Sequence, residues 1–400
     1  MPYLSVKDLD MKGKKVLLRV DFNVPFDKEN NIADLTRIKE SLPTIRLILE
    51  KGGSVILLSH LGRPNGTKNL EYTLKPCAEA LSSLLNHPVF FISDITGQET
   101  KKNLAKLKDG EIVLLENLRF YEAEENPSID LSFAKNLASY GDLYVNDAFG
   151  ASHRQHSSVV TLASHFPSKA AAGLLLEKEI EALDKLTKMP PRPFHAIIGG
   201  AKISSKLGVL QALANKADAL YIGGAMAFTF LSALGIEIGD SPSEPNLINT
   251  AKELINTCKE RKTPLFLPSD LLISKDFSNT SECKTIKSSQ GIENGWRGMD
   301  IGPETLLTWE SELKKARSIF WNGPVGVFEF SHFANGTFTL AKFLSSLSSE
   351  RIIGGGDSVA AINQLGLSNY FTHISTGGGA SLEFLEKGTL PGIEILTKKP

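Results

Sequence analysis

The chain has 400 residues, with 44 basic and 45 acidic side chains and a formal net charge of −1 at pH 7. A chain of this length exceeds what one hydrophobic core normally organises, so it predicts two domains. The charge balance argues against a nucleic-acid or membrane-surface partner, because no global positive field is present to attract one. Any anion must therefore be held by local groups.

The three cysteines, Cys77, Cys258 and Cys283, lack the paired spacing of a metal site. We interpret them as reduced thiols, as is usual in a cytoplasmic protein. The first residues contain no apolar stretch typical of a signal peptide, and no run of about 18 apolar residues predicts a membrane span. We therefore expect a cytoplasmic monomer that is neither secreted nor membrane-bound.

Short aliphatic runs, separated by helix-length amphipathic stretches, predict strands along the whole chain. In the first half the runs are Val16–Val20, Val55–Leu58, Val89–Ile92, Ile112–Leu115 and Leu143–Val145. In the second half they are Ala196–Ile198, Ala219–Ile222, Leu265–Leu267, Ile319–Trp321, Ile352–Ile353 and His373–Ser375. Near-continuous apolar runs of this kind are typical of parallel strands covered by helices on both faces. The pattern predicts an α/β fold.

Between the two series of strands, Leu174–Lys188 has the pattern of one amphipathic helix, and the prolines of residues 189–193 end it. We interpret this helix as the connection between a first domain, residues 1–173, and a second domain, residues 189–388.

The residues that follow the strands differ between the two halves. Ligands bind beyond the carboxyl ends of strands in open α/β sheets. In the first half these positions hold Asp21, Asn23, His60, Arg63, Arg119, Asp147 and Arg154. In the second half they hold glycines, at 199–200, 223–224, 323, 354–356 and 377–379. The arginines suit a small, multiply anionic molecule, and the glycines suit a nucleotide approached closely by backbone amides.

Lys202 and Lys206 follow a predicted strand and are four residues apart, which would place them on one face of a predicted helix, with an anion between them. The segment is not a Walker A loop, and no G-x-G-x-x-G pattern occurs in the chain. A P-loop kinase and a nicotinamide dehydrogenase are thereby disfavoured.

Two glycine clusters each precede a predicted helix. In the first, residues 354–358, Asp357 stands at the helix start, where one carboxylate with nucleotide phosphates would hold Mg²⁺. The alternative is a plain helix N-cap. In the second, Gly377–Gly379 would present open amides to an anion that the sequence does not identify.

Eight segments, in order along the whole chain, resemble the phosphoglycerate kinase family. They are DFNVP (21–25), SHLGRP (59–64), LENLRF (115–120), VNDAFG (145–150), GGAK (199–202), WNGPVGVFE (321–329), GGGDS (354–358) and STGGGASLEFLE (375–386). The resemblance implies two Rossmann-like domains joined by a helix, with the tail 389–400 returning to the first domain. It also implies reversible phosphoryl transfer from 1,3-bisphosphoglycerate to ADP, giving 3-phosphoglycerate and ATP.

The resemblance further implies which residues bind each ligand. For phosphoglycerate they are Asp21, Asn23, Arg37, His60, Leu61, Gly62, Arg63, Arg119 and Arg154. For the nucleotide they are Lys202, Gly223, Gly224, Gly298, Glu329, Gly355, Gly356, Asp357 and Ser358, with Asp357 holding Mg²⁺. For catalysis they are Arg37, Lys202, Lys206, Gly378 and Gly379. The acceptor carboxylate is already ionised near neutral pH, so we expect positioning and charge neutralisation rather than a general base.

Two alternative functions belong to other classes of protein. One is a dehydrogenase on a doubly wound fold, against which the missing dinucleotide pattern counts. The other is a non-enzymatic anion-binding protein, which would have no use for both an arginine set and a glycine set.

Overall fold

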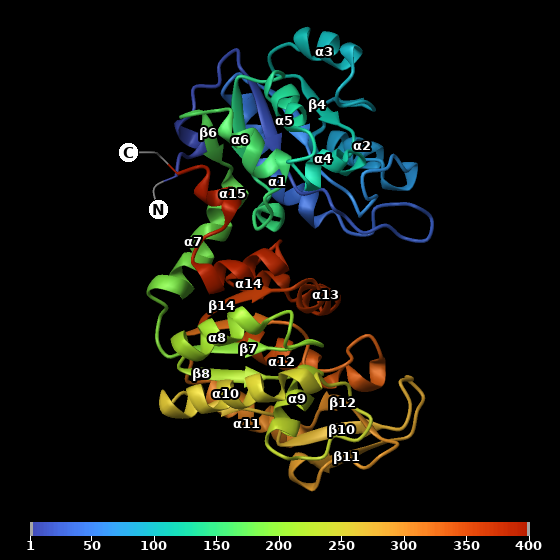
Figure 1. Cartoon of the computed structure of the whole chain (residues 1–400), viewed down its shortest axis with the longest axis vertical. Coiled ribbons are helices and arrows are strands. Elements are labelled where there is room, and N and C mark those ends of the chain that lie inside the picture. Colours follow the sequence, from blue (N-terminus) through green and yellow to red (C-terminus); the bar gives the residue numbers. More distant parts are fainter. Residues whose placement is uncertain (1–2, 398–400) are drawn as a thin grey trace. The chain divides into compact units, whose positions relative to one another are not determined.

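The computed structural model describes residues 3–397. Contacts divide the chain into two compact units, which are described separately below (Figure 1). Unit 1 comprises Met1–Glu181 and Thr389–Pro400, and unit 2 comprises Ala182–Gly388. Each contains a six-stranded parallel sheet flanked by helices, which confirms the predicted α/β fold class.

The sheet of unit 1 has the strand order β3-β4-β2-β1-β5-β6. Its strands are β1 (Lys15–Arg19), β2 (Ser54–Leu58), β3 (Val89–Ile92), β4 (Ile112–Leu115), β5 (Leu143–Asn146) and β6 (Ala170–Ala172). The sequence predicted all of them except β6, because three alanines lack the β-branched side chains that mark a strand. Since all pairs are parallel, the loops after the central strands β1, β2 and β5 leave the sheet at one edge.

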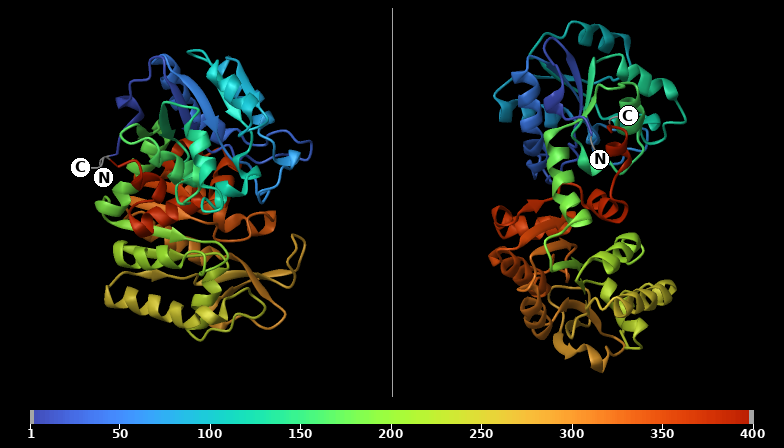
Figure 2. Two further views of the ribbon diagram at one scale, coloured as in Figure 1. Left: turned by 45° about the horizontal axis from the view of Figure 1, so that its top comes forward. Right: turned by 90° about the vertical axis from the view of Figure 1, so that its left-hand side faces the viewer.

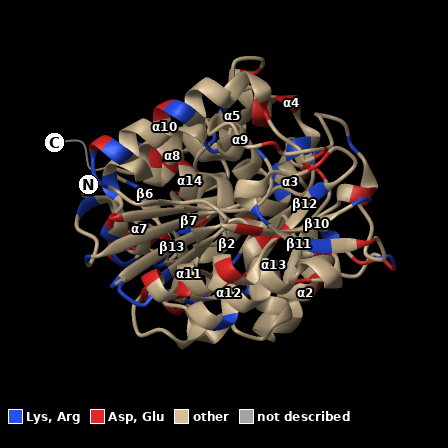
Figure 3. Cartoon of the chain, turned by 90° about the horizontal axis from the view of Figure 1, so that it is seen from below, with Lys and Arg blue, Asp and Glu red and all other residues tan. Residues whose placement is uncertain are grey.

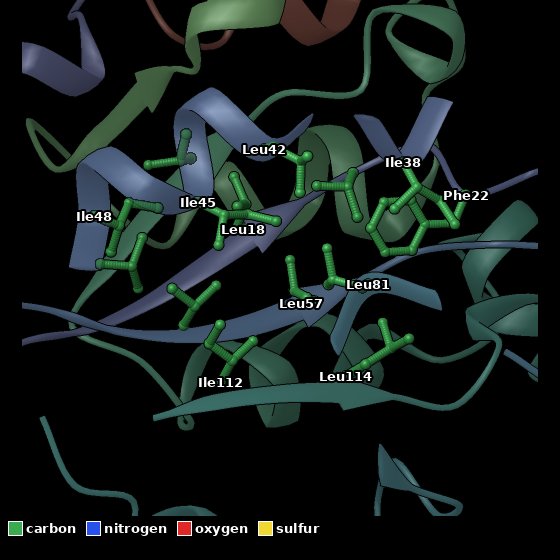
Figure 4. Packing of buried hydrophobic residues seen from close by; sticks show 14 of the residues in the cluster. Leu18, Phe22, Ile38, Leu42, Ile45, Ile48, Leu57, Leu81, Ile112 and Leu114 are labelled. Atoms are coloured by element: carbon green, nitrogen blue, oxygen red, sulfur yellow. The ribbon is translucent and has the colours of Figure 1, made fainter. Parts of the chain in front are cut away.

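The helices of unit 1 cover the sheet. They are α1 (Thr36–Glu50), α2 (Lys75–Leu85), α3 (Gln98–Ala105), α4 (Glu122–Glu125), α5 (Leu131–Ala138), α6 (Leu162–Ser164), the first part of α7 (Leu174–Lys188) and α15 (Pro391–Glu394). On α1, buried Ile38, Leu42 and Ile45 recur at helical spacing and face the sheet. Figure 4 shows them packed over Leu18 and Leu57 of the strands. This core fixes β1 and α1, between which the loop of residues 20–35 lies.

The C-terminal segment packs against unit 1. The Gly392 amide donates to the Ser152 carbonyl (2.9 Å), and Asn146 Nδ2 donates to the Gly392 carbonyl (3.0 Å). Thr397 also forms a bridge with Tyr3 near the other end of the chain. Figures 1 and 2 show this red segment beside the blue and green elements of the unit.

Unit 2 contains two sheets. The parallel sheet has the order β15-β14-β13-β7-β8-β9. Its strands are β7 (Phe194–Ile198), β8 (Ala219–Ile222), β9 (Leu265–Phe266), β13 (Ser318–Asn322), β14 (Glu350–Gly354) and β15 (His373–Ile374). All six coincide with predicted strands, with ends that differ by a few residues.

The second sheet of unit 2 is antiparallel, with the order β11-β10-β12, and it was not predicted. Its strands are β10 (Asp270–Ser274), β11 (Cys283–Lys287) and β12 (Arg297–Ile301). β11 is largely exposed and carries two lysines, while β12 contains a glycine, so neither has the apolar pattern of a buried strand.

The helices of unit 2 surround the parallel sheet (Figure 2). They are the rest of α7, α8 (Leu207–Lys216), α9 (Met226–Ala233), α10 (Ile248–Glu260), α11 (Pro303–Leu313), α12 (Asn335–Ser346), α13 (Gly356–Gln364) and α14 (Gly378–Lys387). Buried Tyr221 on β8 stacks on Phe266 and meets Trp309 of α11 edge-on, with ring centroids 4.7 and 5.3 Å apart. These aromatic contacts join the sheet to its helical layer.

The helix predicted at Leu174–Lys188 is observed as α7, and the division between the units falls within it. Its start is fixed by Asp147, whose Oδ1 accepts from the amides of Leu175 (2.9 Å) and Leu176 (3.1 Å). Asp147 is thus a buried helix cap at the end of β5 and belongs to the connection rather than to a surface for ligands.

Acidic and basic residues are interspersed along the chain, as Figure 3 shows, in agreement with the net charge of −1. Within residues 3–397, no helix is both long and apolar enough to cross a bilayer.

Candidate active site

In unit 1, Asp21 and Asn23 follow β1 and contact two other elements. Asp21 Oδ1 accepts from Arg37 Nη1 of α1 at 2.9 Å. Asn23 Oδ1 accepts from the Gly62 amide at 2.9 Å, which ties this loop to the one after β2. These residues come from separate strands, and the parallel sheet brings them to one edge as the sequence predicted.

The loop after β4 holds the same region from a third side. Buried Asn117 donates to the carbonyls of Leu61 (2.7 Å) and Tyr72 (2.9 Å). Arg119 Nη1 donates to the Gly62 carbonyl at 2.8 Å, and Arg119 Nε lies 3.2 Å from a carboxylate oxygen of Glu125. Arg119 is therefore held in place by two partners.

His60 is buried at the end of β2 and contacts a residue that the sequence did not single out. Its Nδ1 lies 3.2 Å from Nη2 of Arg19, the last residue of β1. Arg19 is 0% exposed, and its Nε donates to Ser158 Oγ at 2.7 Å. A charged residue inside the predicted apolar run Val16–Val20 was the signal that could have revealed it.

The charged groups of this region shift the pKa values of Asp21 and His60. Burial would raise the pKa of Asp21, but Arg37, His60 and Arg19 together with the Asn23 amide hold it below its usual value. Burial lowers the pKa of His60 to well below its usual value, against the opposing effect of Asp21. Asp21 is therefore ionised and His60 neutral near pH 7.

Arg154 belongs to the same electrostatic neighbourhood. Burial lowers the pKa of His156 to about 3, and Arg119, Arg19 and Arg154 add to the effect. Arg154 is exposed, as is Arg63, whereas Leu61 is buried and Gly62 half-buried. The predicted substrate residues thus divide into a held set around Gly62 and two exposed arginines that a ligand can reach.

In unit 2 a pocket of about 400 Å³ opens among the loops of both sheets. Four predicted nucleotide-binding residues line it: Gly224, Gly298, Glu329 and Asp357. The other wall residues are mainly apolar, and they include Phe228, Pro324 and Val325. An apolar cavity with a few polar groups is typical of a small-molecule or cofactor site.

The glycines at the pocket allow neighbouring loops to touch. A Cβ on Gly199 would lie 2.1 Å from the Pro324 carbonyl oxygen, and one on Gly223 would lie 2.7 Å from Val325 Cγ1. Gly224 has φ +65°, and its amide donates to the Val325 carbonyl at 3.0 Å. These glycines are therefore required for the close packing of the loops, and Gly224 also lines the pocket.

The prediction that Lys202 and Lys206 lie on one face of a helix is wrong. Residues 199–206 form turns, and α8 begins at Leu207. The side chain of Glu244 binds the Ser204 amide (3.1 Å), and Lys206 Nζ donates to the Gly199 carbonyl (2.7 Å) and to Asn322 Oδ1 (2.8 Å). These bonds hold the segment as a loop, so the two lysines do not share a helical face.

The two lysines also differ in environment. Lys202 is exposed. Burial lowers the pKa of Lys206 to about 8, although Asp357 opposes this shift. Asp357, the acidic residue that opposes this shift, lines the pocket.

Asp357 lies in the first turn of α13, whose N-cap is Gly355, so Asp357 is not itself the cap. Its carboxylate is exposed and lines the pocket. Among the described residues no cluster of three or more His, Cys, Asp or Glu side chains could hold a metal. One exposed carboxylate beside a nucleotide pocket fits Mg²⁺ carried by nucleotide phosphates, because Mg²⁺ keeps several waters and needs few protein ligands.

Two glycine loops lie next to Asp357. A Cβ on Gly378, at the start of α14, would lie 2.7 Å from Gly355 Cα, so the two loops touch. Gly379 and Gly356 are exposed, and nothing lies within 4 Å of a Cβ placed on Gly356. Ser358 is buried, and its Oγ accepts from the Gly323 amide at 2.6 Å.

Arg297 and Asp300 also line the pocket and were not predicted. Both belong to β12, which the sequence did not reveal as a strand. Burial raises the pKa of Asp300 to about 7, against the amides of Gly336 (2.7 Å) and Ile301 (2.9 Å), which donate to its carboxylate. Asp300 thereby fixes the start of α12 beside the pocket.

Comparisons with known proteins agree with this geometry. The family model described as Phosphoglycerate kinase matches residues 6–388. Phosphoglycerate kinase of Fervidobacterium nodosum is 48% identical over 402 residues, which cover 100% of this chain and 99% of the relative. That of Dictyoglomus turgidum is 49% identical and covers 99% of this chain and 98% of the relative.

Solved structures give the same result. The phosphoglycerate kinase of Coxiella burnetii superposes with a TM-score of 0.87 at 36% identity, covering 99% of each chain. That of Pyrococcus horikoshii OT3 gives 0.84 at 34% identity, covering 98% of each chain. From these full-length matches we conclude that the chain belongs to the phosphoglycerate kinase family of phosphotransferases.

Proposed function

We propose that the chain transfers a phosphoryl group reversibly between 1,3-bisphosphoglycerate and ADP, using unit 1 for the phosphoglycerate and unit 2 for the nucleotide. The observation that carries this assignment is the pocket of about 400 Å³ lined by Gly224, Gly298, Glu329 and Asp357. A dehydrogenase or a non-enzymatic anion-binding protein is not supported, because the full-length relatives are kinases.

On unit 1, Asp21 and Asn23 are proposed to bind the hydroxyl and carboxyl side of phosphoglycerate. Arg119 is held beside Gly62, and Arg63 and Arg154 are exposed. Guanidinium groups match phosphate oxygens in a bidentate manner, so these arginines are proposed to bind the phosphate that is not transferred. His60 and the loop of Leu61 and Gly62 complete this subsite.

On unit 2, the base is proposed to lie against Gly223, Gly224 and Gly298, with Glu329 at the ribose. Lys202 and the glycines of residues 355–356 would then meet the phosphates, with Ser358 supporting the loop through its bond to Gly323. Asp357 is proposed to hold Mg²⁺, which when bound neutralises phosphate charge.

The protein's task in the transfer step is to neutralise charge on the moving phosphoryl group. We assign this to Arg37, Lys202 and the amides of Gly378 and Gly379, with Lys206 in support. Arg37 is half-buried and bonded to Asp21. Gly378 and Gly379 lie in the first turn of α14, whose amides have no partner within the helix. No proton has to be removed, because the acceptor carboxylate is already ionised.

Transfer requires the two ligands to meet, so we propose a hinge motion involving α7, which runs from one unit into the other. Exclusion of water would also protect the acyl phosphate. Small-angle scattering tests this motion: the radius of gyration should fall most when 3-phosphoglycerate and MgADP are present together. Equal contraction with one ligand alone would contradict it.

We also propose a cytoplasmic monomer. Cys77 and Cys258 are buried free thiols and Cys283 is an exposed one, which suits a reducing compartment. Light scattering after gel filtration should give a mass near 43.5 kDa. A mass of twice that value would overturn the monomer.

The direct test of the function is a coupled assay with 1,3-bisphosphoglycerate and MgADP. ATP formation that needs both substrates is expected. Hydride transfer to a nicotinamide cofactor, or binding without turnover, would contradict the proposal.

A further inference from the structure

Arg19 is the centre of a buried hydrogen-bond network under the phosphoglycerate half of the site. Its Nε donates to Ser158 Oγ (2.7 Å), its Nη1 donates to the Val20 carbonyl, and its Nη2 lies 3.2 Å from Nδ1 of His60. Arg19 is 0% exposed, and His60 is buried at 6%. Of these residues, His60 is the one proposed above to contact phosphoglycerate.

The chemistry of the two groups fixes where the proton of His60 lies. A guanidinium has only donors, so an imidazole nitrogen bonded to it must be an acceptor. Nδ1 of His60 is thus unprotonated, and the ring carries its proton on Nε2. The opposite tautomer would set an N–H against the guanidinium, and the doubly protonated ring would add a positive charge beside it.

The guanidinium is itself held from the other side. Ser158 Oγ donates to Glu124 Oε1 at 2.6 Å, and the Ser158 amide donates to Glu124 Oε2 at 3.0 Å. Tyr144 Oη donates to the Ser158 carbonyl at 2.8 Å. Glu124 is fully buried, and its Oε1 lies 3.9 Å from Arg19 Nη2, so the network contains its own counter-charge.

The ionisable groups around His60 have opposing effects on its pKa. Burial has the largest effect and lowers its pKa, and Arg19, Arg119 and Arg37 lower it further, whereas Asp21 raises it. Glu124, behind the guanidinium, has its own pKa raised by burial against the opposing charge of Arg19. The net result favours a neutral ring, in agreement with the hydrogen-bond geometry.

We propose that Arg19 is a positioning residue that fixes His60 as a neutral ring with its proton on Nε2, so that His60 donates a hydrogen bond to an oxygen of bound phosphoglycerate. The proposal rests on the function proposed above for unit 1. In this arrangement His60 contributes direction rather than charge, and its contribution does not change through neutral pH. The cationic attraction comes from the surrounding arginines.

The first test is ¹⁵N NMR of the histidine rings in the full chain, with the His60 signals assigned by their loss in His60→Gln. We expect Nδ1 to be unprotonated and Nε2 protonated from about pH 5 to about pH 8. Addition of 3-phosphoglycerate should shift the Nε2 signal. A ring that carries its proton on Nδ1, or that titrates near its usual pKa of 6.5, overturns the proposal.

The second test removes support for the guanidinium without touching the ligand. Ser158→Ala deletes the acceptor of Arg19 Nε, and Arg19→Lys replaces the fork with a point charge. In either variant we expect the Nδ1-protonated or doubly protonated ring to appear and KM for 3-phosphoglycerate to rise about tenfold. KM for MgATP should stay unchanged. Ser164→Ala, an exposed serine on α6, is the matched control.

Unaltered ring signals and KM in Ser158→Ala overturn the proposal, even where Arg19→Lys fails to fold. The failure of the proposed function is a separate outcome. If the wild-type chain does not form ATP in the coupled assay, the function fails whatever the tautomer. If it does form ATP but Nδ1 carries the proton, only the role of Arg19 fails.

Discussion

The two units offer different kinds of groups for binding anions. In unit 1 the candidate contacts are side chains, and they are braced by other side chains: Asp21 holds Arg37, and buried Arg19 holds His60. In unit 2 the candidate contacts are largely backbone groups, and glycine loops brace one another, as where Gly378 lies against Gly355. Side-chain recognition provides charge at chosen points, whereas backbone recognition provides close approach.

The difference predicts different sensitivities to mutation. Truncating a charged side chain in unit 1 creates no steric clash, so it should weaken ligand binding through the loss of charge. Adding a methyl group to a glycine in unit 2 should instead obstruct the close approach of protein or ligand atoms.

Arg37→Ala should lower kcat about a thousandfold while leaving the Kd of MgADP unchanged, because the charge of Arg37 is needed most in the transition state. Steady-state kinetics and calorimetry measure the two quantities. Arg46→Ala, an exposed arginine on the same helix α1, is the control and should change neither. An unchanged kcat with only a raised KM for 3-phosphoglycerate would contradict the role.

Asp357→Asn should raise the Kd of MgADP about tenfold or more, with little change for ADP in the presence of a chelator, because the proposed partner of the carboxylate is the cation. Titration calorimetry in both conditions measures it. Glu260→Gln, exposed at the end of α10, is the control. Equal losses with and without magnesium would mean that Asp357 acts only on α13.

Gly356→Ala should leave the melting temperature unchanged and raise the Kd of MgADP about tenfold, since the added methyl group meets no protein atom within 4 Å. Gly298→Ala is the contrasting variant, because its Cβ would lie 2.0 Å from Phe228 Cζ. That variant should lose stability as well as affinity. Unchanged nucleotide binding in Gly356→Ala would show that no ligand approaches this glycine.

Asp147→Asn and Asp300→Asn compare buried carboxyls of the two units, in which burial raises the pKa to about 7. Because the folded pKa exceeds the usual value of 3.8, the folded state binds more protons between pH 4 and 7, and this contribution to stability is lost as the pH rises. The variants carry no such proton, so this loss does not affect them. As the pH rises from about 5 to about 8, the melting temperature of each variant should therefore increase by about 2–4 °C relative to that of the wild type. A difference from wild type that does not depend on pH would contradict both assignments.

Most of the parallel strands could be predicted because apolar runs such as Val55–Leu58 are buried on both faces. The antiparallel sheet was missed, because β11 is largely exposed and carries two lysines and β12 contains a glycine. Its absence from the prediction also hid Arg297 and Asp300, which reach the pocket from β12. Local pattern does not reveal a strand that lacks the apolar residues of a buried strand.

The candidate site could be predicted where function leaves a motif, as at Glu329 and Asp357, which line the pocket. The prediction failed where tertiary contacts determine the local structure. The turn at residues 199–206 exists because Glu244 and Asn322, both far along the chain, bind Ser204 and Lys206. Arg19 was missed although the sequence contains its signal, a charged residue inside a run predicted to be buried on both faces.

The central claim is that each unit binds its own ligand. It is tested most directly by titrating two variants, His60→Gln in unit 1 and Asp357→Asn in unit 2, each with 3-phosphoglycerate and with MgADP. We predict that His60→Gln loses affinity for 3-phosphoglycerate and keeps its affinity for MgADP, and that Asp357→Asn does the reverse. Loss of both ligands in either variant, or the exchange of the two results, would contradict the division of the site between the units.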